Sequence, residues 1–313
     1  LWLVTGDGAA PLGVMLTLVA LWGAAEAVAM PAVGALPPRL VDGTRLPDAN
    51  ALLGTVRAAS SVAGPSLAGV LVAALGPAAV LLVDGASYAV SVTTLALIRT
   101  TPVAATGHQS LLRDLQEGWA AFRSRTWLWL TTLHMALFNF LVWAPFLVLG
   151  PVLANARYHG AATWGAVMGV YGLGAVCGGL LLLGRRPRHP LRLGTLASVC
   201  WALPSTGLAA HLATPGVCLT ALAAGTGGAV CGALYQTVIQ QRVPREALGR
   251  VNAYGTLGSF AMGPVGLAVA GPVAELVGIE RVLLGGALWQ CLAVAVVLAA
   301  AAVRHLELAP SED

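Results

Sequence analysis

The chain has 313 residues, of which 58% are hydrophobic and 10% are charged, and its mean hydropathy is +0.81. A soluble domain of this size needs many more polar side chains to cover its surface, so this composition excludes a water-soluble globular fold. A bilayer accepts apolar side chains on the outside of a protein. The sequence therefore predicts an all-α integral membrane protein.

Hydrophobic stretches of about 20 residues, the length that crosses a bilayer, follow one another along the chain. The chain starts inside such a run and without an initiator methionine, which predicts a fragment whose first residues end a further span. After that stub we expect nine spans, at residues 11–36, 50–74, 77–98, 127–150, 162–184, 191–212, 215–239, 251–276 and 279–303.

All 17 basic residues are arginines, and most of them lie in alternate connections between the spans or in the tail. Cytoplasmic loops retain positive charge, so the arginine-rich side is predicted to be cytoplasmic, together with the C-terminus. The opposite connections hold only Arg157 and Arg281. The net charge of +4 is then explained by arginines that mark the cytoplasmic side of the membrane, and no nucleic-acid partner is expected. The arginine-rich side holds Arg39, Arg45, Arg99, Arg113, Arg123, Arg125, Arg185, Arg186, Arg188, Arg192, Arg242, Arg245, Arg250 and Arg304.

Residues 99–126 form the longest connection on the arginine-rich side. Apolar residues recur there at helical spacing opposite charged ones, which predicts an amphipathic helix along the membrane surface with Ser110 as its N-cap. Such a connection is typical of a joint between two bundles. We expect the remainder of an N-terminal bundle at 1–98, a cytoplasmic linker at 99–126, a six-helix bundle at 127–303 and a cytoplasmic tail at 304–313.

The chain resembles itself at an offset of 202 residues, where 39–89 aligns with 241–291. Asn50 meets Asn252, Gly64 meets Gly266 and Gly76 meets Gly278, and small residues of this kind mark turns and close helix packing. The first three spans then correspond to the last three, so three helices are expected to be missing from the front. Restoring them predicts six plus six helices about an axis along the membrane normal.

The run LPPRLVDGTRLPDANALLGTVRAASSVAGPSLAGVL resembles the fourth-to-fifth helix region of major facilitator exporters, and is most similar to the enterobactin and macrolide efflux branch. Within this run, Gly64, Pro65 and Gly69 resemble the antiporter motif of the fifth helix. Ala68 stands where the motif has the first of its paired glycines.

A second resemblance lies in LLLGRRPRHPLRLG, where Gly184, Arg185 and Arg186 resemble the second-half copy of the basic loop that follows the second helix of the family. The resemblance implies two pseudo-symmetric six-helix halves that rock about a central cavity. It also implies a secondary active transporter of the plasma membrane, because exporters of this type expel small amphipathic molecules against proton entry.

The expected partners are accordingly a small-molecule substrate, protons as coupling ion and the lipid bilayer, and we expect a monomer without a cofactor. Two alternatives stay open. The same fold suits a membrane sensor or assembly protein that transports nothing. A chain without its first three helices, which supply part of the cavity, is also predicted to be inactive by itself.

Ionisable side chains inside a span cost about 2.5–3.5 kcal/mol on insertion scales, so each is a functional candidate. Glu26 lies near the middle of its span, Arg57 about two turns into the next, Asp84 in the outer half of the third, and Glu275 near an outer end. Asp84 resembles a recurrent acidic position of the sixth helix, which implies helix packing or gating.

Glu26 has two interpretations. It faces the cavity and loads and releases a proton during transport, because a low-dielectric site favours the neutral carboxyl. Alternatively, it forms a structural charge pair with Arg57 or with an absent helix, since opposite charges on neighbouring helices offset their burial cost. Arg57 itself either closes a gate, forms that pair or attracts an anionic group of the substrate.

Neutral polar residues also occur within the spans. Asn139 and Gln236 are candidates to line the cavity and orient a ligand, or else to form interhelical hydrogen bonds worth about 0.6 kcal/mol each. We expect His134 to lie hydrated near the inner interface. Gly165, Gly169, Gly174 and Gly178 have the spacing of a close helix contact, and Pro145 and Pro151 predict a bend.

No catalytic or nucleotide-binding motif occurs in the sequence, so an enzyme is not expected. The cysteines show no C-x-x-C pair and no histidine at a metal-ligand spacing, so no metal site is predicted. We interpret Cys177, Cys200, Cys218, Cys231 and Cys291 as small buried packing residues.

The predicted topology is testable by cysteine labelling of intact cells. In a background without native cysteines, Arg188→Cys and Arg245→Cys should stay unlabelled by a membrane-impermeant maleimide until the cells are permeabilised. Arg157→Cys and Arg281→Cys, on the opposite side, serve as positive controls. Labelling of positions 188 and 245 from outside would refute the assignment of sides.

Overall fold

The computed structural model describes residues 12–98 and 111–306, and within these ranges the chain forms helices and no strands. The predicted stub at the start, residues 99–110 with Ser110, and the end of the tail lie outside the described residues. The helices are α2 (Leu12–Gly34), α3 (Pro37–Leu40), α4 (Leu46–Leu75), α5 (Pro77–Leu97), α6 (Leu111–Arg123), α7 (Thr126–Phe138), α8 (Ala144–Arg157), α9 (Ala161–Leu182), α10 (Pro190–Ala197), α11 (Ala202–Ala209), α12 (Thr214–Arg242), α13 (Arg245–Phe260), α14 (Gly263–Val277), α15 (Ile279–Ala299) and α16 (Ala301–Arg304). Short helical turns are η1 (Gly43–Arg45), η2 (Asn139–Trp143) and η3 (Ser198–Trp201).

Each of the nine predicted spans corresponds to helical structure in the described residues. Three of them are composite: α7, η2 and α8 run on from one another, as do α10, η3 and α11, and α13 is followed closely by α14. Six of the helical segments are long and apolar enough to cross a membrane by length and composition. The prediction of an all-α membrane protein is therefore confirmed.

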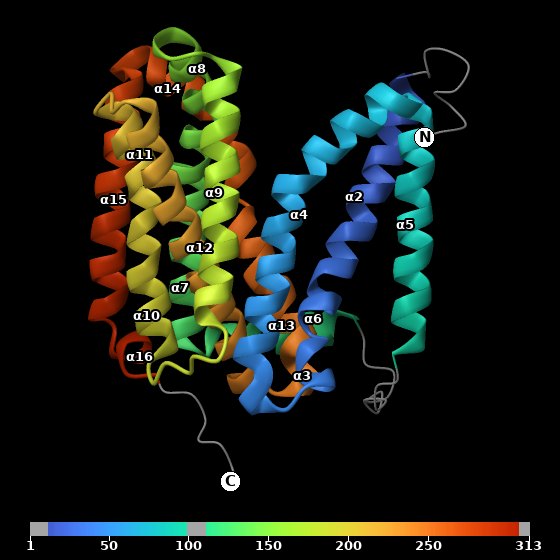
Figure 1. Ribbon diagram of the computed structural model, residues 1–313. Coiled ribbons are helices and arrows are strands. Elements are labelled where there is room, and N and C mark those ends of the chain that lie inside the picture. Colours follow the sequence, from blue (N-terminus) through green and yellow to red (C-terminus); the bar gives the residue numbers. More distant parts are fainter. Residues whose placement is uncertain (1–11, 99–110, 307–313) are drawn as a thin grey trace.

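The helices form two groups that meet at one end (Figure 1). α2, α4 and α5 make up the N-terminal group, and α7 to α15 make up the larger C-terminal group. Across the boundary, α4 packs against α9 and α12, and α2 packs against α13. In Figure 1 these contacts lie toward the lower end, near α3, α6 and α13, while α4 and α9 diverge toward the upper end.

The sequence repeat is visible in the backbone. Gly76 separates α4 from α5 with φ +79°, and its counterpart Gly278 separates α14 from α15 with φ +96°. A positive φ favours glycine because a Cβ would clash with the backbone. Asn50 and Asn252, near the starts of α4 and α13, are also both buried.

The amphipathic helix predicted in the long connection is α6, and it packs against α13. Its buried Phe122 lies 6.2 Å from the ring of Tyr254, and the half-exposed Trp119 lies 5.6 Å from the same ring. Arg250 Nη1 donates to Glu117 Oε2 at 3.3 Å. One aromatic face and one ion pair therefore hold α6 to the C-terminal group.

The helix that contains Pro145 and Pro151 is irregular only before the first of them. The helix widens into a π-helical turn, η2, before Pro145 at the start of α8, and Pro151 sits inside the continuous α8. Proline lacks the N–H that would bond the carbonyl one turn earlier, and its ring displaces that carbonyl, so the strain falls on the turn before Pro145.

α9 and α12 approach each other closely through glycine. A Cβ added at Gly174 or Gly178 would overlap the carbonyl oxygens of Leu222 or Thr226, and one at Gly225 would overlap that of Tyr171. Gly165 and Gly169 have nothing within 4 Å of such a Cβ among the described residues. The predicted close contact is thus made by the second half of the glycine series only.

The interpretation of the cysteines as buried is wrong for one of them. Cys291 is exposed on α15, because it faces away from the neighbouring helices of its group, while Cys177, Cys200, Cys218 and Cys231 are partly buried. All five are free thiols.

The glycine contact makes a prediction about stability. Gly225→Ala should destabilise the chain by about 1–3 kcal/mol, because the added methyl group meets backbone that cannot move independently. Gly232→Ala in the same helix is the matched control, since a Cβ there has open space and alanine favours helix. Thermal unfolding in lipid nanodiscs measures both, and equal midpoints would contradict the packing argument.

Candidate functional site

A cavity of about 430 Å³ lies between the two helix groups in the described part of the chain. This volume is within the range of small-molecule sites. The N-terminal group lines it with Val33, Gly34, Pro37, Asn50, Leu53, Gly54 and Arg57. The C-terminal group lines it with Met135, Ala175, Ala229, Gly232, Ala233, Tyr235, Gln236, Ile239, Gln240, Asn252, Gly255, Thr256, Ser259 and Phe260.

Buried amide groups seal the cavity at the end where the groups meet. Asn50 Nδ2 on α4 donates to Thr237 Oγ1 at 3.0 Å and to Gln240 Oε1 at 2.8 Å, both on α12. Gln240 Nε2 in turn donates to the carbonyl oxygen of Gly34 on α2 at 2.9 Å. We call Asn50, Thr237, Gln240 and Gly34 the amide seal. Since its bonds cross from one group to the other, it holds this end closed.

A second, more exposed set of contacts surrounds the amide seal. Asp48, near the start of α4, accepts the backbone N–H of Gly184 at 2.7 Å and pairs with Arg186 Nη2 at 3.5 Å. Gln241 Nε2 donates to the carbonyl oxygen of Gly43 at 2.8 Å. The loop motif singled out in the sequence thus contacts the N-terminal group, with Arg185 turned back to the carbonyl oxygen of Leu181.

Two of the predicted site residues line the cavity. Arg57 is exposed on α4, and Gln236 is half-buried on α12. Asn252, which the sequence analysis treated only as a repeat position, joins them, and its Nδ2 atom is buried without a hydrogen-bond partner. A Cβ at Gly34 would lie 3.1 Å from Gln236 Nε2 and 3.3 Å from Asn252 Nδ2, so both amides converge on this glycine.

Asn139 and His134 lie away from the lining of this cavity. Asn139 is buried in the wall, where its Nδ2 atom donates to the carbonyl oxygens of Met135 and Ser259, each at 3.0 Å. His134 is buried, contrary to the expectation of a hydrated position, and its Nε2 atom lies 3.3 Å from Gln290 Oε1. His134 was predicted at the wrong depth because α10 and α15 cover it. Both helices are far from His134 in the sequence, so hydropathy around position 134 does not reveal them.

The acidic candidates lie on three different helices, and none of them belongs to the cavity lining. Glu26 is half-buried on α2, and among the described residues it makes no ion pair with Arg57. Asp84 is exposed on α5, and Glu275 is exposed on α14. Near Glu26, α2 and α5 are joined by Trp22 Nε1, which donates to the Tyr88 hydroxyl at 3.3 Å.

The antiporter-like residues Gly64, Pro65 and Gly69 lie along the middle of α4. A Cβ at Gly64 would have nothing within 4 Å among the described residues. Its repeat counterpart Gly266 instead packs tightly on η2 and α8, because a Cβ there would lie 2.8 Å from Ala144 Cβ and 2.9 Å from the carbonyl oxygen of Phe140.

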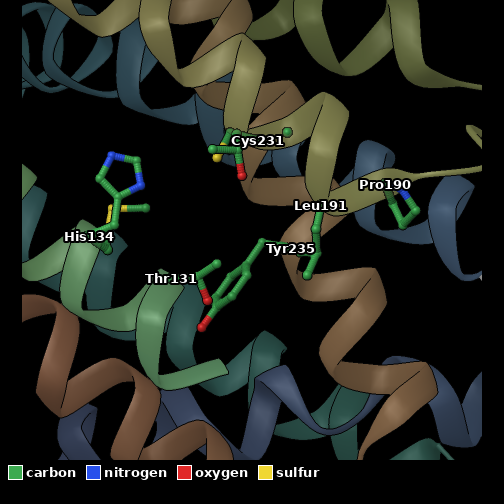
Figure 2. Close-up of a pocket in the computed structure, with 9 residues that line it drawn as sticks. Thr131, His134, Pro190, Leu191, Cys231 and Tyr235 are labelled. Carbon is green, nitrogen blue, oxygen red and sulfur yellow. The ribbon is translucent and has the colours of Figure 1, made fainter. Parts of the chain in front are cut away.

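A second, much smaller cavity of about 20 Å³ lies inside the C-terminal group, between α7, α10 and α12 (Figure 2). Figure 2 shows Thr131 and Tyr235 directed toward each other on one side, with His134 and Cys231 above them. Tyr235 hydroxyl lies 3.2 Å from Thr132 Oγ1. This volume holds one water molecule and is too small for a substrate, so the cavity between the groups is the candidate site.

The described residues contain no cluster of three or more histidine, cysteine or carboxylate side chains that could hold a metal ion. The cavity between the two helix groups is largely apolar, and its lining includes a few side-chain amides and the guanidinium of Arg57. Such a lining binds small molecules by shape and orients them with a few polar contacts.

Comparison with known proteins agrees with this geometry. The model of the Major Facilitator Superfamily matches residues 1–267. The chain is 29% identical over 267 residues to the uncharacterized MFS-type transporter y4rN of Sinorhizobium fredii, which covers 83% of this chain and 65% of that protein. It is 25% identical over 263 residues to the multidrug efflux pump Tap of Mycobacterium bovis and of Mycobacterium tuberculosis, which covers 80% of this chain and 61% of that pump. The chain thus spans less than two thirds of the length of these relatives.

The amide seal makes a prediction about the closed end. Gln240→Leu removes one of the two acceptors of Asn50 Nδ2 and the donor to the Gly34 carbonyl, at a cost of about 1–3 kcal/mol, and leaves Asn50 bonded to Thr237 alone. Spin labels at the exposed positions Leu40 and Leu183, on opposite groups, should then report longer distances. Gln241→Leu is the control, because it removes one bond nearer the surface. A larger opening in the control than in Gln240→Leu would contradict this role.

Proposed function

The chain belongs to the major facilitator superfamily, and from this premise we propose that it forms part of a proton-driven exporter of small amphipathic molecules. Its relatives are transporters, and the chain is a multi-pass membrane protein. The observation that carries the proposal is the cavity of about 430 Å³ between the two helix groups, sealed at one end by side chains from both.

The sealed end carries the arginine-rich connections, which the charge rule assigns to the cytoplasm together with the C-terminus. We accordingly place the protein in the plasma membrane, with its cavity open to the outer side in this conformation. Transport then requires the amide seal to break and the opposite ends of the groups to meet, which is alternating access. The parts 1–98, 99–126, 127–303 and 304–313 are the proposed first bundle, linker, second bundle and tail.

Export of amphipathic compounds is supported by three observations. The lining is mostly apolar, with a few polar side chains. One of the relatives is named as a multidrug efflux pump, and Gly64, Pro65 and Gly69 resemble the antiporter motif. We propose that the protein acts as a monomer, without enzymatic activity or a cofactor.

Proton coupling is assigned to Glu26. It is the carboxylate nearest the middle of a span, it is half-buried on α2, and no ion pair with Arg57 neutralises it in the described part of the chain. A carboxyl in such a position exchanges a proton according to which side of the membrane it faces. Asp84, exposed on α5 among lipid-facing residues, is assigned to helix packing or gating.

This proposal predicts that Glu26→Gln, in cells that express the complete reading frame containing this chain, reduces efflux driven by a pH gradient to the background of vector-only cells. Glutamine keeps the shape of the side chain but cannot release a proton. Glu275→Gln is the matched control, since it removes an exposed carboxylate near an outer end and should retain efflux. The measurement is dye efflux before and after a protonophore; unchanged, gradient-dependent efflux by Glu26→Gln would refute the coupling role.

A further inference from the structure

We infer that the cavity selects amphiphiles with an anionic head group and disfavours cationic ones. This inference rests on the proposed transport function and narrows it to a substrate class. It follows from the charge and hydrogen-bond donors of the cavity lining.

Among the described residues that line the cavity, Arg57 is the only formally charged one and none is a carboxylate. Its side chain is exposed, and it makes no hydrogen bond or ion pair among the described residues. A guanidinium presents a rigid fork of N–H donors that matches a carboxylate or phosphate, and it repels a cation in the same site. The lining therefore favours negative charge.

Glu26 does not cancel this preference. It lies on α2 eight residues before Gly34, which is about 12 Å along a helix, and it is absent from the lining. Arg57 lies seven residues after Asn50 on α4, about 10 Å along the helix, so both residues lie beyond the amide seal, but only Arg57 belongs to the lining. A proton on Glu26 leaves the positive charge of Arg57 without an opposing carboxylate.

The cavity floor adds hydrogen-bond donors that lack acceptors. Asn252 Nδ2 is buried and unpaired, and it converges with Gln236 Nε2 on Gly34. The carbonyl oxygen of Gly34 accepts from Gln240, and Asn252 Nδ2 has no acceptor among the described residues. A buried donor without a partner is costly, and an oxygen of a ligand head group that reaches the floor relieves that cost.

The apolar remainder of the lining accommodates the body of such a molecule. Leu53, Met135, Ile239 and Phe260 belong to the lining, with small residues between them. A cavity of about 430 Å³ takes a compound of drug size. The substrate class is therefore an apolar body with one carboxylate, sulfonate or phosphate group.

The test compares two fluorescent esters that share a xanthene skeleton and differ in charge, the anionic fluorescein ethyl ester and the cationic tetramethylrhodamine ethyl ester. Binding to the chain in nanodiscs of neutral lipid is measured by fluorescence anisotropy. We expect the anionic dye to bind roughly tenfold more tightly or better. Arg57→Gln should remove this preference and Arg57→Lys should keep most of it.

Two further variants separate the site from the general charge of the chain. Arg281→Gln removes the same charge at an exposed position outside the cavity lining and should leave the preference unchanged. Asn252→Asp, of nearly the same shape, replaces the unpaired donor with a carboxylate and should weaken binding of the anionic dye while strengthening that of the cationic dye.

The outcomes distinguish this inference from the proposed function. Tighter binding of the cationic dye, or a preference that survives Arg57→Gln, overturns the anionic selection and leaves the transporter assignment intact. Failure of the unmodified chain to bind either dye overturns both the proposed cavity function and this inference.

Discussion

The hydrogen bonds of Asn50 hold the two helix groups together, and the rest of the site depends on them. In a bilayer the backbone of each helix is satisfied internally, so contacts between helices are left to packing and to a few polar side chains. Asn50 joins α4 to α12, and Gln240 extends the connection to α2. The cavity has a floor because these bonds close one end of the boundary.

Small residues determine where the groups meet and where they separate. Near the sealed end, Gly179 on α9 lies so close to α4 that an added Cβ would overlap Thr55 Oγ1. Farther along the same helices, Gly165 and Gly169 on α9 and Gly64 on α4 have open space beside them. This distribution suits two rigid groups that exchange one contact surface for another, since glycine surfaces allow backbones to approach without rearranging side chains.

The polar groups of the boundary are divided between structure and ligand. The side-chain amides of Asn139 and Asn50 donate hydrogen bonds to protein oxygens, so the two residues have structural roles. Arg57 and the Nδ2 atom of Asn252 have no protein partner in the described residues, although both residues line the cavity. N–H donors that lack a protein acceptor and lie beside a cavity are suited to ligand binding. A ligand can accept their hydrogen bonds in place of solvent, and no protein hydrogen bond has to break.

The sequence by itself determined the medium, the order of the helical segments, the amphipathic α6 and the repeat, because these follow from hydropathy, periodicity and residue identity. Gly76 and Gly278 were paired from sequence, and the backbone gives both a positive φ. Gln236 was predicted as a cavity-lining candidate and Arg57 as a charge-pair or gate residue, and both belong to the lining of the cavity. Only the tertiary structure decided that Asn139 is consumed within the wall, that His134 is buried beside Gln290, and that Asn252 is an unpaired donor. Those outcomes depend on which face of each helix meets a neighbour, and residues far apart in the chain settle that orientation, which hydropathy alone does not encode.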